Sequence, residues 1–110
     1  MLKNKTLSML GLARRAGKLS MGHDMAEKSI KAHRAKLILL CSDASKRLVS
    51  EFERTLENFG LDIPLVVADI TMNEIHFAVG YKAGVMTVDD VNFSDKIIRL
   101  IEQEENANGH

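Results

Sequence analysis

The chain has 110 residues, which suffices for one globular domain and leaves little room for a second. Its apolar runs are too short to span a membrane, and Gly11, Arg14 and Arg15 interrupt the N-terminal stretch, so we expect neither a transmembrane segment nor a signal peptide. Cys41 is the single cysteine, which excludes an internal disulfide and favours a cytoplasmic location.

The formal net charge is zero, but the charges are segregated along the chain. The first 40 residues contain nine Lys and Arg against two acidic residues, and the remainder contains six basic against thirteen acidic residues. Such asymmetry predicts a basic end that faces a polyanion, on an otherwise acidic body. The alternative is that the fold mixes the two sets in space.

Apolar periodicity predicts helices and strands in alternation. In chain order we expect a helix over residues 2–16, a short strand over 18–21, a helix over about 23–33, a strand over 36–41 and a helix over about 45–59. A strand over 63–68, a short helix from 71 to about 80, a strand over 85–88 and a helix from 92 or 94 through 101 follow. This alternation predicts an α/β fold, a three-layer α/β/α sandwich with a four-stranded, mainly parallel or mixed sheet.

Local signals support individual elements. The run KLILLC at 36–41 and the run at 63–68 are continuously apolar, as is typical of strands buried on both faces; Pro64 belongs near the start of the second or on an edge. Thr71 and Glu74 have the spacing of a helix capping box. We expect residues 1–103 to form one domain and the polar tail 104–110 to fray.

The histidines do not form a metal-binding pattern. His23, His33, His76 and His110 are scattered, and none pairs with another His or Cys at the spacing that a helical metal site needs. His23 and the adjacent Asp24 could bind a metal only with distant partners. We therefore expect no metal and no other cofactor.

Two residues near the second strand could in principle serve catalysis. Cys41 lies inside the strand, where a free cysteine is usually a small core residue. Asp43 lies beyond the strand's carboxyl end, where open α/β sheets bind ligands, but the neighbouring Ser42 and Ser45 favour a cap of the next helix. An enzyme that uses Asp43 or Asp24 is thus a further alternative, and we expect no catalysis.

Residues 17–36 combine features that suit a phosphate backbone. A short strand leads through Gly22 into a helix, whose N-terminus exposes unpaired N–H groups and a partial positive charge. Lys18 and Lys28 are expected to flank this turn, and Lys31 and Arg34 extend the basic face. The alternative is a surface helix with an ordinary solvated face.

Four segments carry a resemblance to a known family: GLARRAGKL at 11–19, AKLILLCSDAS at 35–45, FGLDIPL at 59–65 and TMNEIHFAVG at 71–80. With them, the chain from about residue 7 to residue 101 resembles the L-seven-Ae family of kink-turn-binding ribosomal proteins, in particular its bacterial YlxQ-like branch. The resemblance implies a three-layer α/β/α fold and recognition of structured RNA.

Members of that family hold kinked RNA on the strand-to-helix turn, where their pattern is Gly-x-Asn-Glu-x-x-Lys. Gly22 and Lys28 match this pattern, whereas Asp24 and Met25 replace the Asn–Glu pair. Ionised Asp24 can only accept hydrogen bonds, while Met25 can pack on a base. The resemblance also implies a second, apolar contact ahead of the short helix, at about residues 68–70.

Together these observations predict a non-catalytic, monomeric protein that binds structured RNA, kink-turn-like or ribosomal, in a ribosome or another ribonucleoprotein. The alternative is a protein-interaction module on the same fold that has lost kink-turn RNA binding. The predicted RNA-binding residues are Gly22, His23, Asp24, Met25 and Lys28 at the centre, Arg14, Arg15, Lys18, Lys31 and Arg34 at phosphates, and Ile70 as an apolar contact.

Overall fold

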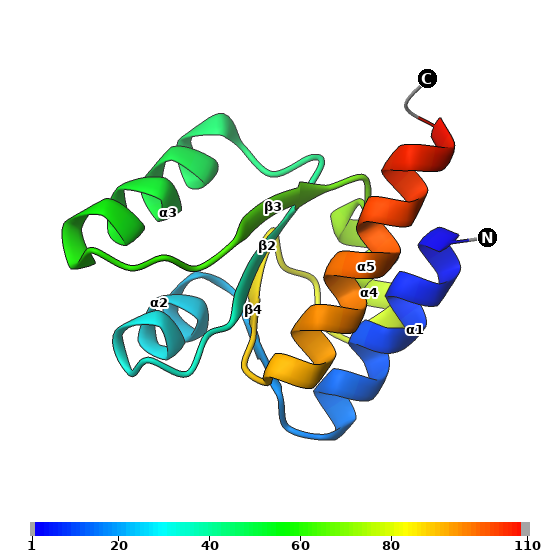
Figure 1. The fold of residues 1–110 in the computed structure, drawn as a ribbon, viewed down its shortest axis with the longest axis horizontal. Coiled ribbons are helices and arrows are strands. Elements are labelled where there is room, and N and C mark those ends of the chain that lie inside the picture. Colours follow the sequence, from blue (N-terminus) through cyan, green and yellow to red (C-terminus); the bar gives the residue numbers. More distant parts are fainter. Residues whose placement is uncertain (1, 109–110) are drawn as a thin grey trace.

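The computed structural model describes residues 2–108, in which helices and strands alternate (Figure 1). The helices are α1 (Leu2–Arg15), α2 (His23–Lys31), α3 (Lys46–Phe59), α4 (Met72–Val79) and α5 (Val91–Asn108). The strands are β1 (Leu19–Met21), β2 (Leu37–Cys41), β3 (Leu65–Ala68) and β4 (Val85–Val88). Every predicted element is present in this range, and α5 alone differs substantially in length. No helix of the described range has the length and apolar character needed to cross a membrane.

The sheet is mixed and has the strand order β1-β4-β2-β3. β2 and β3 run parallel, whereas β4 is antiparallel to both of its neighbours, β1 and β2. The prediction that the third strand is buried on both faces is wrong, because β3 lies at a sheet edge, where Val67 is 50% exposed. Pro64 directly precedes this edge strand, where its missing N–H interrupts no interior ladder.

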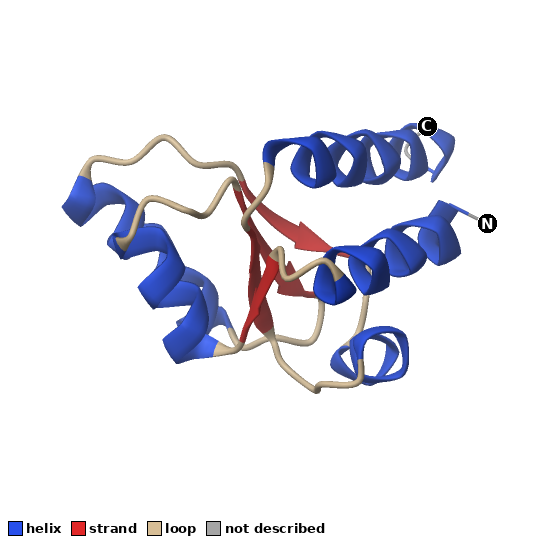
Figure 2. Cartoon of the chain, turned by 90° about the horizontal axis from the view of Figure 1, so that it is seen from below, coloured by secondary structure: helices blue, strands red, loops and turns tan. Residues whose placement is uncertain are grey.

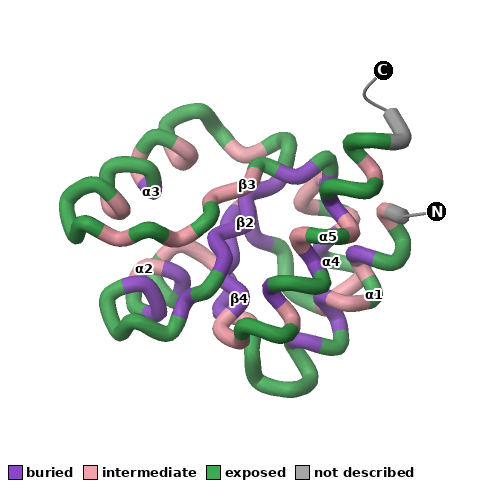
Figure 3. The backbone as a smooth tube through the Cα atoms, in the orientation of Figure 1, coloured by how far each residue is buried: buried purple, intermediate pink, exposed green. Residues whose placement is uncertain are grey.

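Helices cover both faces of the sheet and give the three expected layers (Figure 2). One hydrophobic core lies under α1, α4 and α5 and contains Leu10, Ile75 and Ile97. The other lies under α2 and α3 and contains Ile30 and Phe52. β2 is buried along its whole length between the two cores (Figure 3). Full burial of one such side chain contributes about 1.5–3 kcal/mol, so the two apolar layers dominate stability.

The last helix begins earlier and ends later than predicted. A carboxylate oxygen of Asp90 accepts a hydrogen bond from the Phe93 N–H at 3.0 Å, which starts α5 at Val91. The helix continues to Asn108, so the predicted tail is helical as far as that residue. Residues 109–110 lie outside the described range.

The predicted capping box at the start of α4 is confirmed. The Thr71 hydroxyl accepts from the Glu74 N–H at 3.2 Å, and a Glu74 carboxylate oxygen accepts from the Thr71 N–H at 2.9 Å. Lys3 of α1 lies 3.2 Å from the other carboxylate oxygen. The Thr71 N–H and then Lys3 hold the pKa of Glu74 below its ordinary value.

Replacing Glu74 with glutamine is expected to destabilise the fold by about 0.3–1 kcal/mol at neutral pH, because glutamine keeps the capping geometry without the charge. The pKa of Glu74 is lower in the folded chain than in the unfolded one. Its charge therefore stabilises the fold above the unfolded pKa of about 4.3, and this contribution disappears as pH falls through the folded value.

Urea unfolding of the original chain and of Glu74→Gln at neutral and acidic pH measures the difference in stability. Glu57→Gln, at an exposed position of α3, is the control, and a difference that does not depend on pH would contradict the prediction.

Candidate nucleic-acid interface

The turn between β1 and α2 presents backbone N–H groups at the surface. Gly22 has φ +89° and ψ 169°, a conformation essentially restricted to glycine. Its N–H donates to the Val85 carbonyl at 2.9 Å, and its own carbonyl accepts from the Ala26 N–H at 2.9 Å. No side chain of the described residues caps α2 at this turn. The first N–H groups of α2 are therefore available to an acceptor, and the helix dipole favours an anion.

Tyr81 lies beside this turn and is a candidate contact that the sequence did not indicate. Its hydroxyl is 3.7 Å from the position that a Cβ on Gly22 would take, and the residue is 47% exposed. The Arg14 guanidinium lies over the Tyr81 ring, 5.5 Å from its centre. Both residues line, with Met25 and β1, a shallow hollow of about 290 Å³. The signal in the sequence is an aromatic residue directly after Gly80, which ends α4.

One carboxylate ties β1, α2 and β4 together behind the turn. Asp89 accepts hydrogen bonds from the hydroxyls of Ser20 on β1 at 2.6 Å, Ser29 on α2 at 2.6 Å and Thr87 on β4 at 2.8 Å. The Asp89 N–H donates to the Lys18 carbonyl at 2.8 Å. Because Ser20 and Ser29 meet at Asp89, α2 runs back alongside β1 from the Gly22 turn.

This course of α2 brings two predicted basic residues to the same end of β1. Lys28 precedes Ser29, which donates to Asp89, and the Lys18 carbonyl accepts from the Asp89 N–H. Both lysines are exposed, and neither has an ion-pair partner among residues 2–108. We call the set that borders β1 the β1 surface; it consists of Arg14, Lys18, Gly22, Met25, Lys28 and Tyr81.

Lys31, another predicted RNA contact, lies on the side of α2 that faces α3. Lys31 lies 3.4 Å from Glu27, one turn earlier on α2. Its ammonium group is 5.7 Å from the centre of the Phe59 ring at the end of α3. Lys31 is thus directed toward α3 and away from the β1 surface.

His23, also predicted as an RNA contact, is held by acidic and aromatic neighbours. Its Nε2 is hydrogen-bonded to a Glu51 carboxylate on α3, and its Nδ1 lies 3.2 Å from an Asp24 carboxylate oxygen. The ring packs edge-on against Phe52, with centroids 5.4 Å apart and planes at 70°. The hydrogen bond to Glu51 raises the pKa of His23, and partial burial opposes it. The imidazole is therefore turned toward α3.

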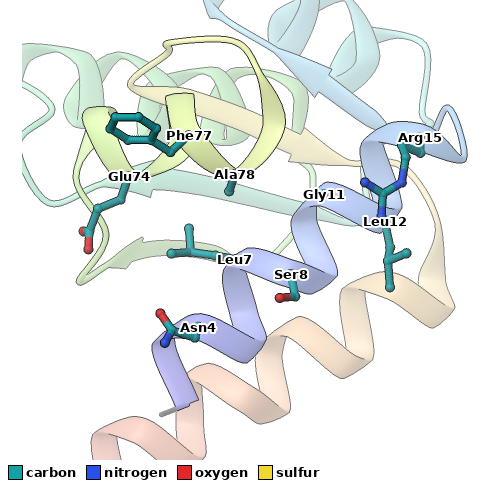
Figure 4. A pocket seen from close by; sticks show the side chains of 9 residues that line it. All are labelled: Asn4, Leu7, Ser8, Gly11, Leu12, Arg15, Glu74, Phe77 and Ala78. Atoms are coloured by element: carbon teal, nitrogen blue, oxygen red, sulfur yellow. The ribbon is translucent and has the colours of Figure 1, made fainter.

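The remaining predicted residues are not part of the β1 surface. Asp24 has a fully exposed side chain at the start of α2, and Arg34 is exposed in the turn after that helix. Arg15 lines a separate hollow of about 620 Å³ between α1 and α4, where Glu74 lies at the opposite end (Figure 4). Glu74 already forms the capping box and an ion pair with Lys3, so Arg15 and Glu74 do not pair with each other.

The prediction that Ile70 supplies an apolar RNA contact is wrong. Ile70 is 3% exposed and packs in the core that α1, α4 and α5 cover. It follows β3, the edge opposite β1, so three strand spacings of about 4.8 Å each separate the two edges. Tyr81 supplies the apolar surface beside Gly22 instead.

Cys41 and Asp43 have structural roles. Cys41 is buried, and burial is the main reason that its pKa is raised to about 12, so the thiolate that a nucleophile needs is disfavoured. A carboxylate oxygen of Asp43 accepts from the Met72 N–H of α4 at 3.0 Å. The prediction that Asp43 caps the next helix is wrong, because Ser45 caps α3 by accepting from Leu48.

A family model described as the ribosomal protein L7Ae/L30e/S12e/Gadd45 family matches residues 4–98. The chain belongs to this family. A relative named RNA-binding protein YlxQ, from Bacillus subtilis (strain 168), is 32% identical over 95 residues, which cover 86% of this chain and 92% of the relative. A protein of the same name from Enterococcus faecium is 27% identical over 100 residues, 91% of this chain and 94% of the relative. The predicted L-seven-Ae resemblance and its YlxQ-like branch are confirmed.

Solved structures share the fold of this L7Ae-family chain. A protein of unknown function from Bacillus halodurans C has a TM-score of 0.78 at 30% identity, covering 89% of this chain and 97% of that one. The 15.5kD RNA binding protein of Giardia lamblia has a TM-score of 0.66 at 16% identity, covering 96% of this chain and 88% of that one. The second similarity supports the fold alone.

Proposed function

We propose that this chain is a non-catalytic RNA-binding protein whose β1 surface holds the backbone of a structured RNA. The observation that carries the proposal is the uncapped N-terminus of α2 behind Gly22, with the Arg14–Tyr81 pair beside it and exposed Lys28 farther along the same helix. Helix N–H groups and lysines bind phosphate oxygens, and aromatic and guanidinium planes stack on unpaired bases. The names of the two YlxQ relatives agree with this proposal.

Kink-turn-like or ribosomal RNA is the target that we propose. Such RNA is recognised by shape and by unstacked bases. Asp24 is exposed at the start of α2 and can accept from guanine N–H groups, while Lys28 can donate to guanine O6 or N7. Met25 is 50% exposed and offers apolar surface to a base next to Tyr81. A bent RNA with unpaired guanines should therefore bind more tightly than a regular duplex.

Replacing Lys28 with alanine is expected to weaken RNA binding by about 1–3 kcal/mol, because it removes an exposed cation of the β1 surface. Filter binding to a kink-turn RNA over a KCl series measures both the affinity and its salt dependence. The slope of log affinity against log salt should fall by about one. Lys96→Ala removes an exposed lysine from α5, on the other face of the sheet, and should change neither quantity. RNA binding that does not depend on salt, or an equal loss of affinity in Lys28→Ala and Lys96→Ala, would contradict the proposal.

A second candidate function is a protein-interaction module on the same fold. The observation in its favour is Phe77 on α4, which is 90% exposed and borders the hollow between α1 and α4. A partner that remains bound to the chain after ribonuclease treatment, and is lost on Phe77→Ala, supports this function. If Phe77→Ala leaves RNA binding unchanged, the surface around Phe77 is distinct from the β1 surface.

A further inference from the structure

Three side chains with metal-ligating atoms meet between α2 and α3. His23 and Glu27 lie one helical turn apart on α2, and Glu51 reaches them from α3. A ring nitrogen of His23 and one carboxylate oxygen of each glutamate all lie within 4.8 Å of one another. We propose that His23, Glu27 and Glu51 form a binding site for a divalent transition metal such as Zn²⁺, which would link α2 to α3.

The separations among these atoms are close to those of a tetrahedral zinc site. Zn²⁺ binds nitrogen and oxygen ligands at about 2.0–2.2 Å, which places two ligands of one ion about 3.4 Å apart. The widest pair therefore needs to approach by at most about 1.4 Å, whereas Nε2 of His23 and the Glu51 oxygen, which are hydrogen-bonded directly, need to move apart to admit the ion. The side chains of His23, Glu27 and Glu51 are 39%, 34% and 38% exposed, so the glutamates have room to rotate. Their exposure also leaves space for water in the fourth position.

The His23 ring already has an orientation that suits metal binding. Its edge-on packing against Phe52 restricts the ring plane. Its Nδ1 lies 3.2 Å from Asp24, and metal-bound histidines commonly donate their second N–H to a carboxylate. With the Nδ1 proton held by Asp24, Nε2 is the ring atom left to bind a metal, and binding there replaces its proton and its hydrogen bond to Glu51. Asp24 is then a positioning residue for the site.

The chemistry of the donors selects the class of ion. An imidazole nitrogen with two carboxylate oxygens suits Zn²⁺ and neighbouring transition metals, whereas Mg²⁺ and Ca²⁺ prefer oxygen ligands throughout. The two glutamates also supply negative charge that a divalent cation neutralises. Lys31 contacts Glu27 at 3.4 Å, but exposed pairs of this kind contribute little, so a metal ion can displace the ammonium group.

Isothermal titration of ZnCl₂ into the full chain, prepared free of metal and without RNA, tests the proposal independently of the proposed function. One saturable site per chain is expected. His23→Ala and Glu51→Gln should each lower the affinity about 100-fold, and Asp24→Asn about tenfold. Visible absorption of bound Co²⁺ should indicate four-coordinate nitrogen and oxygen ligation, and excess Mg²⁺ should not compete.

Matched controls separate this site from the other acidic and histidine side chains. Glu53→Gln on α3 and His76→Ala on α4 change exposed residues outside the cluster and should leave the Zn²⁺ affinity unchanged. Circular dichroism checks that each variant is folded, and the partly exposed Glu27→Gln provides a ligand variant if His23→Ala does not fold. No saturable binding, or unchanged affinity in the folded ligand variants, would overturn the proposal.

Discussion

Replacing Asp89 with alanine is expected to lower the free energy of unfolding by about 3 kcal/mol. The substitution leaves the hydroxyls of Ser20, Ser29 and Thr87 without their acceptor, on three elements that pack together. A hydrogen bond to a charged group contributes about 1.5–3 kcal/mol, and the loss is smaller than three such bonds because hydroxyls can rotate toward other acceptors. RNA affinity should fall as well, because Asp89 positions α2 against β1.

Urea unfolding of Asp89→Ala and Asp89→Asn tests this role. The amide introduced by the second substitution would retain one acceptor oxygen, so this variant should lose less stability than the first. Asp95→Ala changes an exposed residue of α5 and should be nearly neutral. If Asp89→Ala is as stable as Asp95→Ala, the carboxylate does not hold the three elements together.

Replacing Gly22 with alanine is expected to destabilise the chain by about 1–3 kcal/mol and to weaken RNA binding about tenfold or more. The strain comes from the backbone, because φ +89° with ψ 169° is a region that residues with a Cβ avoid. Relief of that strain would move the first N–H groups of α2, whereas the added methyl group itself would meet the Tyr81 hydroxyl only at an ordinary contact distance of 3.7 Å. Stability and binding should therefore fall together.

Gly60→Ala provides the matched control for this substitution. Gly60 also has a positive φ, of +60°, but lies in the left-handed helical region at the end of α3, and apart from its two chain neighbours no described residue has an atom within 4 Å of an added Cβ. Alanine there should cost about 1 kcal/mol and leave RNA affinity unchanged. Chemical unfolding and filter binding of both variants measure the two quantities. A Gly22→Ala protein that binds RNA as tightly as Gly60→Ala would exclude the turn from the interface.

Much of the fold could be predicted from the sequence because the signals are local. The apolar run at 36–41 is the fully buried β2, and the spacing of Thr71 and Glu74 is the capping box that starts α4. The turn into a helix at Gly22 is also predictable, and its positive φ agrees with that expectation. The prediction failed for β3, since strand order depends on contacts between distant segments and a continuous apolar run does not distinguish an interior strand from an edge.

The candidate site was predictable only in part for the same reason. Lys28 lies on the predicted helix, but the course of that helix beside β1 depends on Asp89, which is 60 residues beyond Ser29. Tyr81 comes to Gly22 because β4 pairs with β1, and Ile70 is removed from it because β3 forms the other edge. His23 pairs with Glu51 through the packing of α2 and α3 on one face of the sheet.

The sequence by itself determined the alternation of helices and strands, the capping box of Thr71 and Glu74 that starts α4, and the resemblance to the L7Ae family. These features depend on residues close together in the chain, whose periodicity and capping groups act locally. The tertiary structure alone decided which side chains share a surface. It placed Arg14 and Tyr81 beside the Gly22 turn and Glu51 beside His23, because sheet order and helix packing bring together residues that no local pattern connects.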